Sequence, residues 1–385
     1  MADAHLTSIA THFGHLTDPR VERTRDHNLL DILTIAICAI LAGADGPTSM
    51  ETFGKAKEEW LRSILPLPNG IPSHDTFNRV LAHLKPAELQ QGFRAWFAAI
   101  QTATQGELVA LDGKTLRKSA AKAWGKAAVQ MVSAWASTNR LILGQEKVNP
   151  ASNEITAVPA LLEKLALRGC IVTVDALHCQ VKTAATIVQG DADYVIAAKG
   201  NQATLHHAIQ QAFTEAHKVG FVDLAHDTYQ TEERHHGRWE RRTYWTLMAP
   251  AVLATVNPTG RWPKLQCIGM VRAERQVQGK MSIEERFSIS SLDGNARSFG
   301  TAVRSHWGIE NSVHWLLDLV FREDDCRISV GNGAENLAVL RHSALNLLQQ
   351  DRSSKQSMKQ KRFRAALDTN YLRRLLVGPA PANGA

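Results

Sequence analysis

The chain has 385 residues, of which 44% are hydrophobic and 21% charged, and a formal net charge of +7. These values are typical of a folded protein and exclude a disordered or fibrous chain. No run of 18 apolar residues is present and the first residues lack a basic and apolar leader, so neither a membrane-spanning helix nor secretion is expected. The five cysteines are scattered without a Cys-x-x-Cys pair, so we expect free thiols in a reducing cytoplasm rather than a zinc site or a disulfide framework.

The first 104 residues have a helical pattern. An apolar segment, LLDILTIAICAILAGA, ends near Gly43, and an amphipathic segment, SMETFGKAKEEWLRSIL, ends before Pro66. Two further helical segments follow, and Pro86 suits the first turn of the second one. We therefore predict an N-terminal helical domain over residues 1–104.

From Glu107 the pattern changes to that of an α/β domain. The segments ELVALDG, AVQMVSAWAS and RLILGQEKV have the character of strands, and so do CIVTVDA and DYVIAAKG, each of which follows a helical segment. The predicted order is therefore strand, strand, strand, helix, strand, helix, strand, with one more helix after it. This order predicts a mixed sheet with flanking helices, and residues 105–217 form the first part of this core.

The rest of the chain divides into three segments. Residues 218–294 contain β segments with polar alternation, and we predict a β-rich insertion there because a structureless linker of this length is uncommon inside a domain. A helical pattern returns after Asn295 with ARSFGTAVRSHWGIENSVHWLLDLVF. Residues 295–350 are predicted as the second part of the core. Residues 351–385 are basic: between Asp351 and Leu376 there are eight basic residues and two acids. Such a stripe suits contact with a polyanion, and a solvated helix face is the alternative.

Three acidic residues have contexts that together predict one metal site. Asp112 and Asp175 each follow a short apolar run of strand type, and Glu310 lies in the later helical segment. Such runs suit central strands of a covered sheet, and a carboxylate at the end of such a strand can point into a cleft. Hard oxygen ligands that converge from rigid elements suit Mg²⁺-dependent phosphoryl transfer. Taken singly, each aspartate could also be an ordinary turn or helix cap.

The segments around these acids resemble a known family. ALDGKTLRKS, VTVDALHCQ with DYVIAAKGNQ, and HWGIENSVHWLLDLVFREDDCRI are similar to segments of the DDE transposases of bacterial insertion sequences, above all the H-repeat-associated (ISAs-type) group. DPR, DILTIAICAILAGADG and LPNGIPSHDTFNRV resemble the leader domain of that group, so the likeness runs from about Asp18 to about Leu376. The resemblance implies an RNase H-like catalytic core whose catalytic residues and metal ligands are Asp112, Asp175 and Glu310.

One departure from the wider superfamily concerns the helix around the glutamate. That superfamily often carries a tyrosine, an arginine and a lysine there, and the corresponding positions in this chain are Val303, His306 and Leu317. The roles of these neighbours are therefore not carried over. At four-residue spacing His306, Glu310 and His314 share one helix face, so a zinc site is an alternative. We rank it below histidines that contact phosphate or orient Glu310.

The resemblance also implies the cofactor, the partners and the reaction. Two Mg²⁺ ions, for which Mn²⁺ can substitute, would lie about 3.5–4 Å apart. Asp112 would bridge them, and Asp175 and Glu310 would each hold one side. The expected partner is double-stranded DNA, both transposon ends and target, bound by a homodimer in the bacterial cytoplasm in association with the nucleoid. The expected reaction is cleavage at insertion-sequence ends and transfer of the 3′-hydroxyl into target DNA. A nuclease without strand transfer and a transposase-derived DNA-binding regulator are the alternatives.

Several basic residues are candidate DNA contacts, with solvated side chains as the alternative. The N-terminal helices could likewise grip DNA ends or serve only for packing. The candidates are Lys114, Lys199, Arg304, His306, Lys359, Lys361, Arg362 and Arg364.

Overall fold

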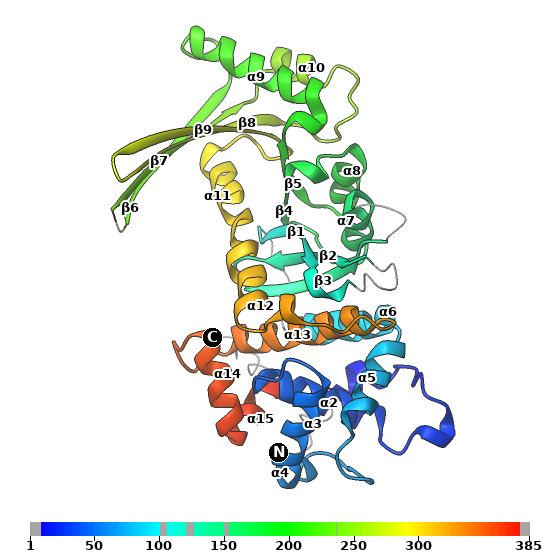
Figure 1. Cartoon of the computed structure of the whole chain (residues 1–385). Coiled ribbons are helices and arrows are strands. Elements are labelled where there is room, and N and C mark those ends of the chain that lie inside the picture. Colours follow the sequence, from blue (N-terminus) through cyan, green and yellow to red (C-terminus); the bar gives the residue numbers. More distant parts are fainter. Residues whose placement is uncertain (1–8, 101–105, 121–126, 150–153, 236, 378–385) are drawn as a thin grey trace, which may run out of the picture.

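The computed structural model describes residues 9–100, 106–120, 127–149, 154–235 and 237–377. Figure 1 shows three parts: a helical body built from the first and the last helices, a sheet with flanking helices above it, and an arm of long strands that projects to one side. In the described part of the chain, none of the helices is long and apolar enough to cross a bilayer.

All strands of the described residues belong to one mixed sheet of nine strands. They are β1 (Leu108–Leu116), β2 (Val129–Ala136), β3 (Leu141–Lys147), β4 (Ile171–Val174), β5 (Asp193–Ala198), β6 (His226–His235), β7 (Arg238–Leu247), β8 (Cys267–Val277) and β9 (Lys280–Ser290). Their order in the sheet is β3-β2-β1-β4-β5-β9-β8-β7-β6. β1 is parallel to β4 and β4 to β5, and the other neighbouring strands are antiparallel.

The first five strands form the core of an RNase H-like α/β fold, as the sequence predicts. α7 (Glu154–Leu162) lies between β3 and β4 in the chain, and α8 (Val181–Gln189) between β4 and β5, which is the predicted order. α7 packs on β2 and β3 and α8 on β5, while α11 (Ala296–His306) packs on β1, β4 and β5. Figure 1 shows α11 on the opposite side of the sheet from α7 and α8. Because helices cover both faces, the apolar runs of the central strands are buried.

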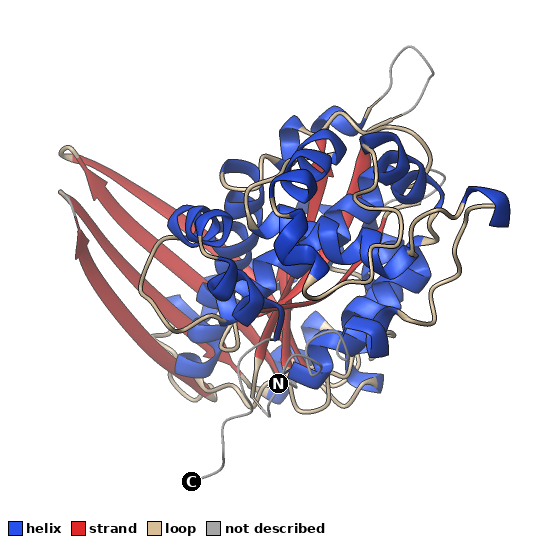
Figure 2. Ribbon diagram, turned by 90° about the horizontal axis from the view of Figure 1, so that it is seen from below, coloured by secondary structure: helices blue, strands red, loops and turns tan. Residues whose placement is uncertain are grey.

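Residues 218–294, predicted as a β-rich insertion, extend the main sheet instead of forming a separate subdomain. β9 pairs with β5 from Ser290 opposite Val195 to Phe287 opposite Ala198. The last residues of β9 are buried in the core, whereas the first ones are exposed. The outer parts of β6–β9 therefore form the arm, and Figure 2 shows it reaching beyond the helices. At its base α9 (Ala203–Lys218) packs on β9, and α10 (Pro250–Val256) packs on α9.

The N-terminal helices do not form a body of their own, contrary to expectation. The helices of the lower body are α2 (Leu29–Leu41), α3 (Pro47–Ala56), α4 (Glu58–Arg62), α5 (His74–His83), α6 (Pro86–Ile100), α13 (Gly333–Gln350), α14 (Met358–Leu367) and α15 (Thr369–Val377). α13 is buried almost along its whole length and packs against α2, α5, α6 and β3. A helix that is buried on every face needs cover on every side. Helices from both ends of the chain provide this cover in one shared core.

The segment predicted as one helix after the arm is divided in the structure. α11 ends at His306, a π-helical turn, η6 (Glu310–His314), follows, and α12 (Trp315–Leu319) continues. Gly308 lies in the break, where an added Cβ would be 2.8 Å from the ring of Trp135 on β2. The turn therefore packs closely on the sheet. π turns inside helices are frequent at functional sites.

Candidate metal centre

Asp112 and Asp175 lie at the same level of the sheet, although Asp112 is within β1, which continues to Leu116, whereas Asp175 directly follows the end of β4. β1 and β4 run parallel, and Leu111 pairs with Val174, so the next residue on each strand is an aspartate. β4 ends at Val174, and the Asp175 carboxylate accepts a hydrogen bond from the backbone N–H of His178 at 3.4 Å. Open α/β sheets bind ligands at the carboxyl ends of their parallel strands.

The π turn brings two more potential ligands to Asp112. Nδ1 of His314 lies 3.1 Å from Oε2 of Glu310 and 3.5 Å from Oδ2 of Asp112. One donor atom from each of the three residues lies within 4.8 Å of the others. The Glu310 side chain is 59% exposed and that of Asp112 28%, whereas His314 is buried. The group is therefore anchored in the protein by His314 and open to solvent at Glu310.

The carboxylates of this centre repel one another. Burial raises the pKa of Asp112, and the negative charges of Asp175 and Glu310 raise it further, while His314 acts in the opposite direction. Like charges that are held together in a partly buried site disfavour the ionised form. A cation bound among these carboxylates would relieve the repulsion.

A fourth carboxylate, which the sequence analysis did not identify, lies beside the three predicted ones. Glu154 is the first residue of α7, and an added Cβ on Gly113 would be 2.7 Å from its carboxyl group. Burial raises the pKa of Glu154, and so do Asp112 and Asp175. Glu154 follows no apolar strand and belongs to none of the segments that resemble the family. Only the packing of α7 on β2 and β3 brings it to the centre.

A cavity of about 540 Å³ opens at the three predicted carboxylates. His306 of α11 lines it and shares a hydrogen bond of 3.1 Å between Nδ1 and Oγ1 of Thr173. Burial lowers the pKa of His306. Lys199 is exposed at this cavity, and Arg286 lies over the half-exposed ring of Trp307, 4.8 Å from its centroid. The cavity thus combines acidic groups on one side with basic and aromatic groups on the other.

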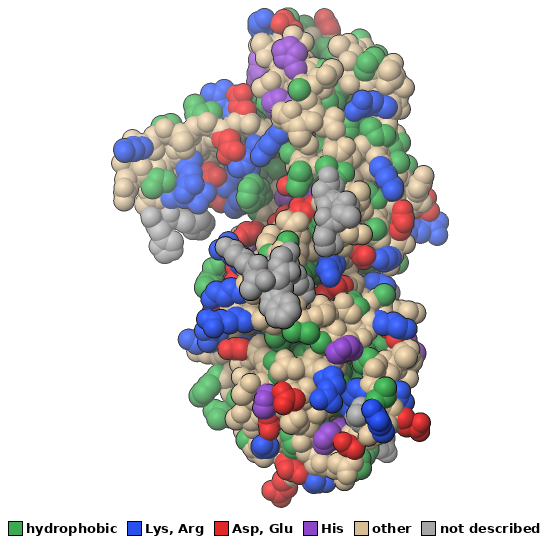
Figure 3. Space-filling view, turned by 45° about the vertical axis from the view of Figure 1, so that its right-hand side comes forward, with side chains coloured by type: hydrophobic (Ala, Val, Ile, Leu, Met, Phe, Trp, Pro, Cys, Tyr) green, Lys and Arg blue, Asp and Glu red, His purple; other side chains and the backbone are tan. Residues whose placement is uncertain are grey.

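A second hollow, of about 380 Å³, adjoins the first along the arm, because Arg286 and Trp307 line both. Figure 3 shows basic side chains gathered over the arm. The arginines that line the hollow are Arg238, Arg242, Arg275, Arg286 and Arg304. Acidic side chains neutralise part of this charge, for example Glu233, which lies 3.3 Å from Arg304.

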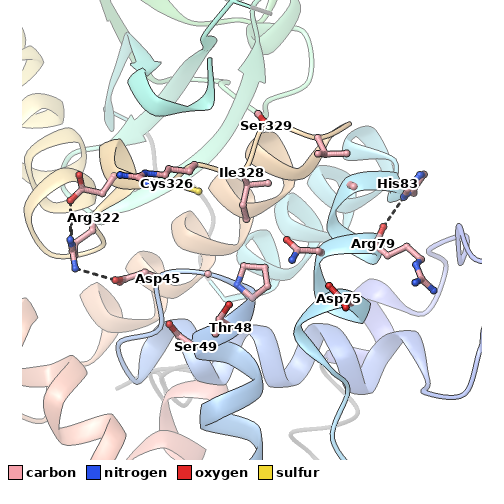
Figure 4. A pocket seen from close by; sticks show the side chains of 17 residues that line it. Asp45, Thr48, Ser49, Asp75, Arg79, His83, Arg322, Cys326, Ile328 and Ser329 are labelled. Carbon is pink, nitrogen blue, oxygen red and sulfur yellow. Dashed lines mark hydrogen bonds and ion pairs between the residues drawn. The ribbon is translucent and has the colours of Figure 1, made fainter. Parts of the chain in front are cut away.

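A larger hollow, of about 850 Å³, lies at the helical body. Figure 4 shows Thr48 at the start of α3, Arg79 on α5, and Arg322 between two acids. Arg322 pairs with Asp45 at 3.5 Å and with Asp325 at 3.3 Å. Among the described residues, the lining of this hollow has no member in common with the lining of the carboxylate cavity. Its acids are engaged in ion pairs, so we place no chemistry there.

Three of the predicted DNA contacts have their charges engaged within the protein itself, and Lys114 is the first of them. Its side chain is 10% exposed and forms ion pairs with Asp318 and, at 3.2 Å, with Glu323. Its charge is thus neutralised by two acids of the chain itself. The residue links β1 to the segment after α12.

Lys361 and Arg362 of the basic C-terminal segment are the other two. Both side chains are buried. Lys361 donates to the carbonyl of Leu348 at 3.0 Å, and Arg362 donates to the carbonyl of Ile40 at 2.8 Å. These carbonyls lie in the last turns of α13 and α2, where basic side chains are favourable. The two residues therefore join helices and leave no charge for DNA.

The remaining predicted contacts stay accessible. Lys199 and Lys359 are exposed, Arg304 is half-exposed, Arg364 is partly buried, and His306 lines the carboxylate cavity. In the basic C-terminal segment, Lys359 and Arg364 are therefore accessible to DNA, whereas Lys361 and Arg362 are buried. The arginines of the arm hollow add positive charge much nearer to the cavity.

Comparisons with known proteins show the family of the chain. A cryo-EM structure of a piggyBac transposase synaptic complex with hairpin DNA aligns over 99% of this chain and 84% of that chain, with 12% identity and a TM-score of 0.43. The chain is 36% identical over 379 residues to the "H repeat-associated putative transposase YhhI" of Escherichia coli strain K12, covering 97% of this chain and 98% of that protein. It is also 36% identical to the "Putative transposase YncI" of Escherichia coli O157:H7, covering 97% and 95%. Residues 10–97 match the family DDE_Tnp_1-associated, and residues 103–347 match the family Transposase DDE domain. The chain therefore belongs to the DDE transposase family.

Proposed function

We propose that the protein is an active DNA transposase, which cuts DNA at the ends of an insertion sequence and joins the freed 3′-hydroxyl to target DNA. The observation that carries this proposal is the meeting of Asp112, Asp175 and Glu310 at one cavity, from two adjacent strands and a π turn. A protein that only binds DNA gains nothing from crowded carboxylates, because they repel a polyanion. Membership of the transposase family supports DNA as the substrate.

The donor set of the cavity fits divalent metal ions. Carboxylate oxygens are the ligands that Mg²⁺ prefers, and the raised pKa of Asp112 reflects a negative charge that a cation would neutralise. Asp112, Asp175 and Glu310 would hold two Mg²⁺ ions, and Mn²⁺ could take their place. Bound there, the ions would stabilise negative charge on the attacking and leaving oxygens of a phosphodiester.

The side chains around the carboxylates would position the DNA strand. Lys199 and Arg286 border the cavity and would face phosphates next to the one that reacts. His306 is held by its hydrogen bond with Thr173, and its lowered pKa keeps it neutral near neutral pH. It would therefore contact the DNA strand through hydrogen bonds and not through charge. Because Arg286 stands on β9 and His306 on α11, these two groups would hold the DNA strand in place for in-line attack with little rearrangement.

The arginine-lined hollow of the arm is the proposed path of the DNA duplex. Replacing Arg275 and Arg304 by serine should weaken DNA binding, and the slope of log affinity against log salt should fall by about 0.9 for each lost phosphate contact. Arg168, an 88% exposed residue after α7, provides the control: Arg168→Ser should leave the slope unchanged. An unchanged slope in the arm variant would show that the duplex follows another face.

Joining requires two transposon ends in one complex, so we propose that the protein is a homodimer when it is bound to DNA and that it acts on chromosomal DNA in the nucleoid. Light scattering of the protein mixed with an end-sequence duplex measures the number of chains in the complex. Two chains with two duplexes is the expected result. One chain with one duplex would contradict the dimer.

A joining assay tests the function itself. A labelled, pre-cleaved insertion-sequence end is incubated with plasmid DNA and Mg²⁺, and an uncut end is tested in parallel. A transposase joins the end to the plasmid, a nuclease cuts without joining, and a DNA-binding regulator does neither.

The same assay tests the three carboxylates. Cutting and joining should each be abolished by Asp112→Asn, Asp175→Asn and Glu310→Gln, because each substitution keeps the shape of the side chain but removes a ligand charge. DNA binding should remain. Asp191→Asn, at an exposed turn, is the matched control and should remain active.

A further inference from the structure

We propose that His314 is a metal ligand of this centre, so that the ion held by Glu310 is bound by nitrogen as well as oxygen. A first-row transition ion such as Mn²⁺ would then bind there in preference to Mg²⁺. The proposal rests on the metal site of the proposed function and adds a ligand to it.

The distances around His314 are those of atoms that share one ion. Its Nδ1 lies 3.1 Å from the nearer oxygen of Glu310 and 3.5 Å from that of Asp112. Neighbouring ligands of an octahedral ion with bonds of about 2.1 Å are about 3 Å apart. Among the residues with described side chains, Asp112, Glu310 and His314 are the one set of three potential ligand residues whose donor atoms all lie within 4.8 Å of one another.

Burial identifies the nitrogen that would bind. His314 is 4% exposed, and its Nε2 is buried without a hydrogen-bond partner among the described residues. Nδ1 alone therefore reaches the carboxylates. A neutral imidazole carries its proton on one nitrogen and offers a lone pair on the other, which suits a proton on Nε2 and a metal at Nδ1. The open side at Glu310 leaves coordination positions for water and DNA oxygens.

The competing role for His314 is that of a hydrogen-bond donor that only orients the carboxylates. A single N–H points at one acceptor, yet Nδ1 lies near two carboxylates, and 3.5 Å is long for a hydrogen bond to the second. An ion between the three donor atoms would contact all of them. The π turn places Glu310 and His314 at its two ends, where both side chains reach the same point.

A nitrogen ligand changes which ion the site selects. Mg²⁺ takes oxygen ligands and gives up its water reluctantly. Sites with nitrogen ligands bind first-row transition ions, and their affinity for these ions rises from Mn²⁺ towards Cu²⁺. The centre should therefore prefer Mn²⁺ to Mg²⁺, although the three acids alone would suit either ion.

Pulsed electron paramagnetic resonance of Mn²⁺ bound to the metal-free full-length protein, without DNA, tests the ligand directly. A bonded imidazole gives a ¹⁴N coupling to Mn²⁺, and we expect this coupling in the natural protein. Protein labelled with ¹⁵N-histidine should show a ¹⁵N coupling instead. The coupling should disappear in His314→Leu and persist in His306→Gln, which removes the imidazole that lines the carboxylate cavity.

Binding measurements add the selectivity. His314→Leu should weaken Mn²⁺ binding about tenfold or more, since even the loss of a group that supports a ligand costs on the order of tenfold. Mg²⁺ binding should change much less.

The absence of a nitrogen coupling in the natural protein would overturn the proposal, and this result does not depend on the folding of any variant. A coupling that persists in His314→Leu overturns it as well. Joining of DNA without a nitrogen coupling would leave the transposase function intact, whereas a coupling without joining would leave the ligand intact and reject the function.

Discussion

Asp112 carries an electrostatic conflict in the site. Its pKa is raised in the folded protein by burial and by neighbouring carboxylates, so its ionised form destabilises the fold once the pH rises through that pKa. Asp112→Asn should therefore raise the melting temperature of the metal-free protein at pH 8, by about 2 °C or more. Added Mn²⁺ should stabilise the natural protein and not the variant. The control is Asp191→Asn, in EDTA and in Mn²⁺. A lower melting temperature of Asp112→Asn than of the natural protein in EDTA would show that ionised Asp112 does not destabilise the metal-free fold.

His342 predicts how the protein responds to acid. Burial, with the nearby charges of Lys114 and Arg341, lowers its pKa from 6.5 to about 3. Between these values the unfolded chain binds a proton that the folded protein does not, so stability falls as the pH drops below 6.5. The slope is at most about 1.4 kcal/mol per pH unit. His342→Leu should make urea unfolding less sensitive to pH between 6.5 and 4.5.

The control for this prediction is His207→Leu, which replaces an exposed histidine on α9. It should leave the pH dependence of unfolding as it is in the natural protein. If His342→Leu unfolds with the same pH dependence as the natural protein, another group causes the loss of stability in acid.

At the scale of elements, Lys114 joins β1 to the segment after α12, where η7 (Glu323–Asp325) lies. It is paired with two acids, and the Glu323 side chain is only 1% exposed. Lys114→Met should lower the free energy of unfolding by about 3 kcal/mol, because it leaves buried negative charge unpaired. Lys118→Met, which breaks a pair that is about half exposed, should cost less than about 1 kcal/mol. Urea unfolding measures both. Adding Glu323→Gln to Lys114→Met should restore part of the loss, and equal costs for the two lysines would contradict a buried pair.

Elements that depend on local patterns could be predicted from the sequence, and those that depend on distant packing could not. The strands that carry or precede Asp112 and Asp175 begin as short apolar runs, so their order and the strand-end position of Asp175 follow from the sequence. The same reasoning misplaces the end of β1, because pairing with β2 extends this strand through Asp112 to Leu116. The π turn at Glu310 is different, because it lies next to the contact of Gly308 with Trp135 on another element. Arg362 has the sequence context of a solvated basic helix, yet its carbonyl partner lies 322 positions earlier.

For the whole molecule, the shared helical core has a consequence for how the site is held. The same buried cluster contains α2 from the N-terminal part, α13 from the C-terminal part, and Ile309 and Val313 at the π turn. The turn that carries Glu310 is thus packed against a core that needs both ends of the chain. The helical body therefore supports the metal centre as well as any DNA contact of its own.

This coupling predicts that a change near the C-terminal end loosens the N-terminal helices. Leu345 of α13 is completely buried in the shared core, and Leu345→Ala should destabilise it by about 2–5 kcal/mol. Hydrogen exchange followed by mass spectrometry should then show faster exchange in α2, about 300 residues away in sequence, because the two helices pack directly. Ile187→Ala is the matched control, since Ile187 is equally buried in the separate cluster on the other face of the sheet. It should speed exchange in α8 and leave α2 protected. If Leu345→Ala leaves α2 as protected as in the natural protein, the N-terminal helices are a body of their own after all.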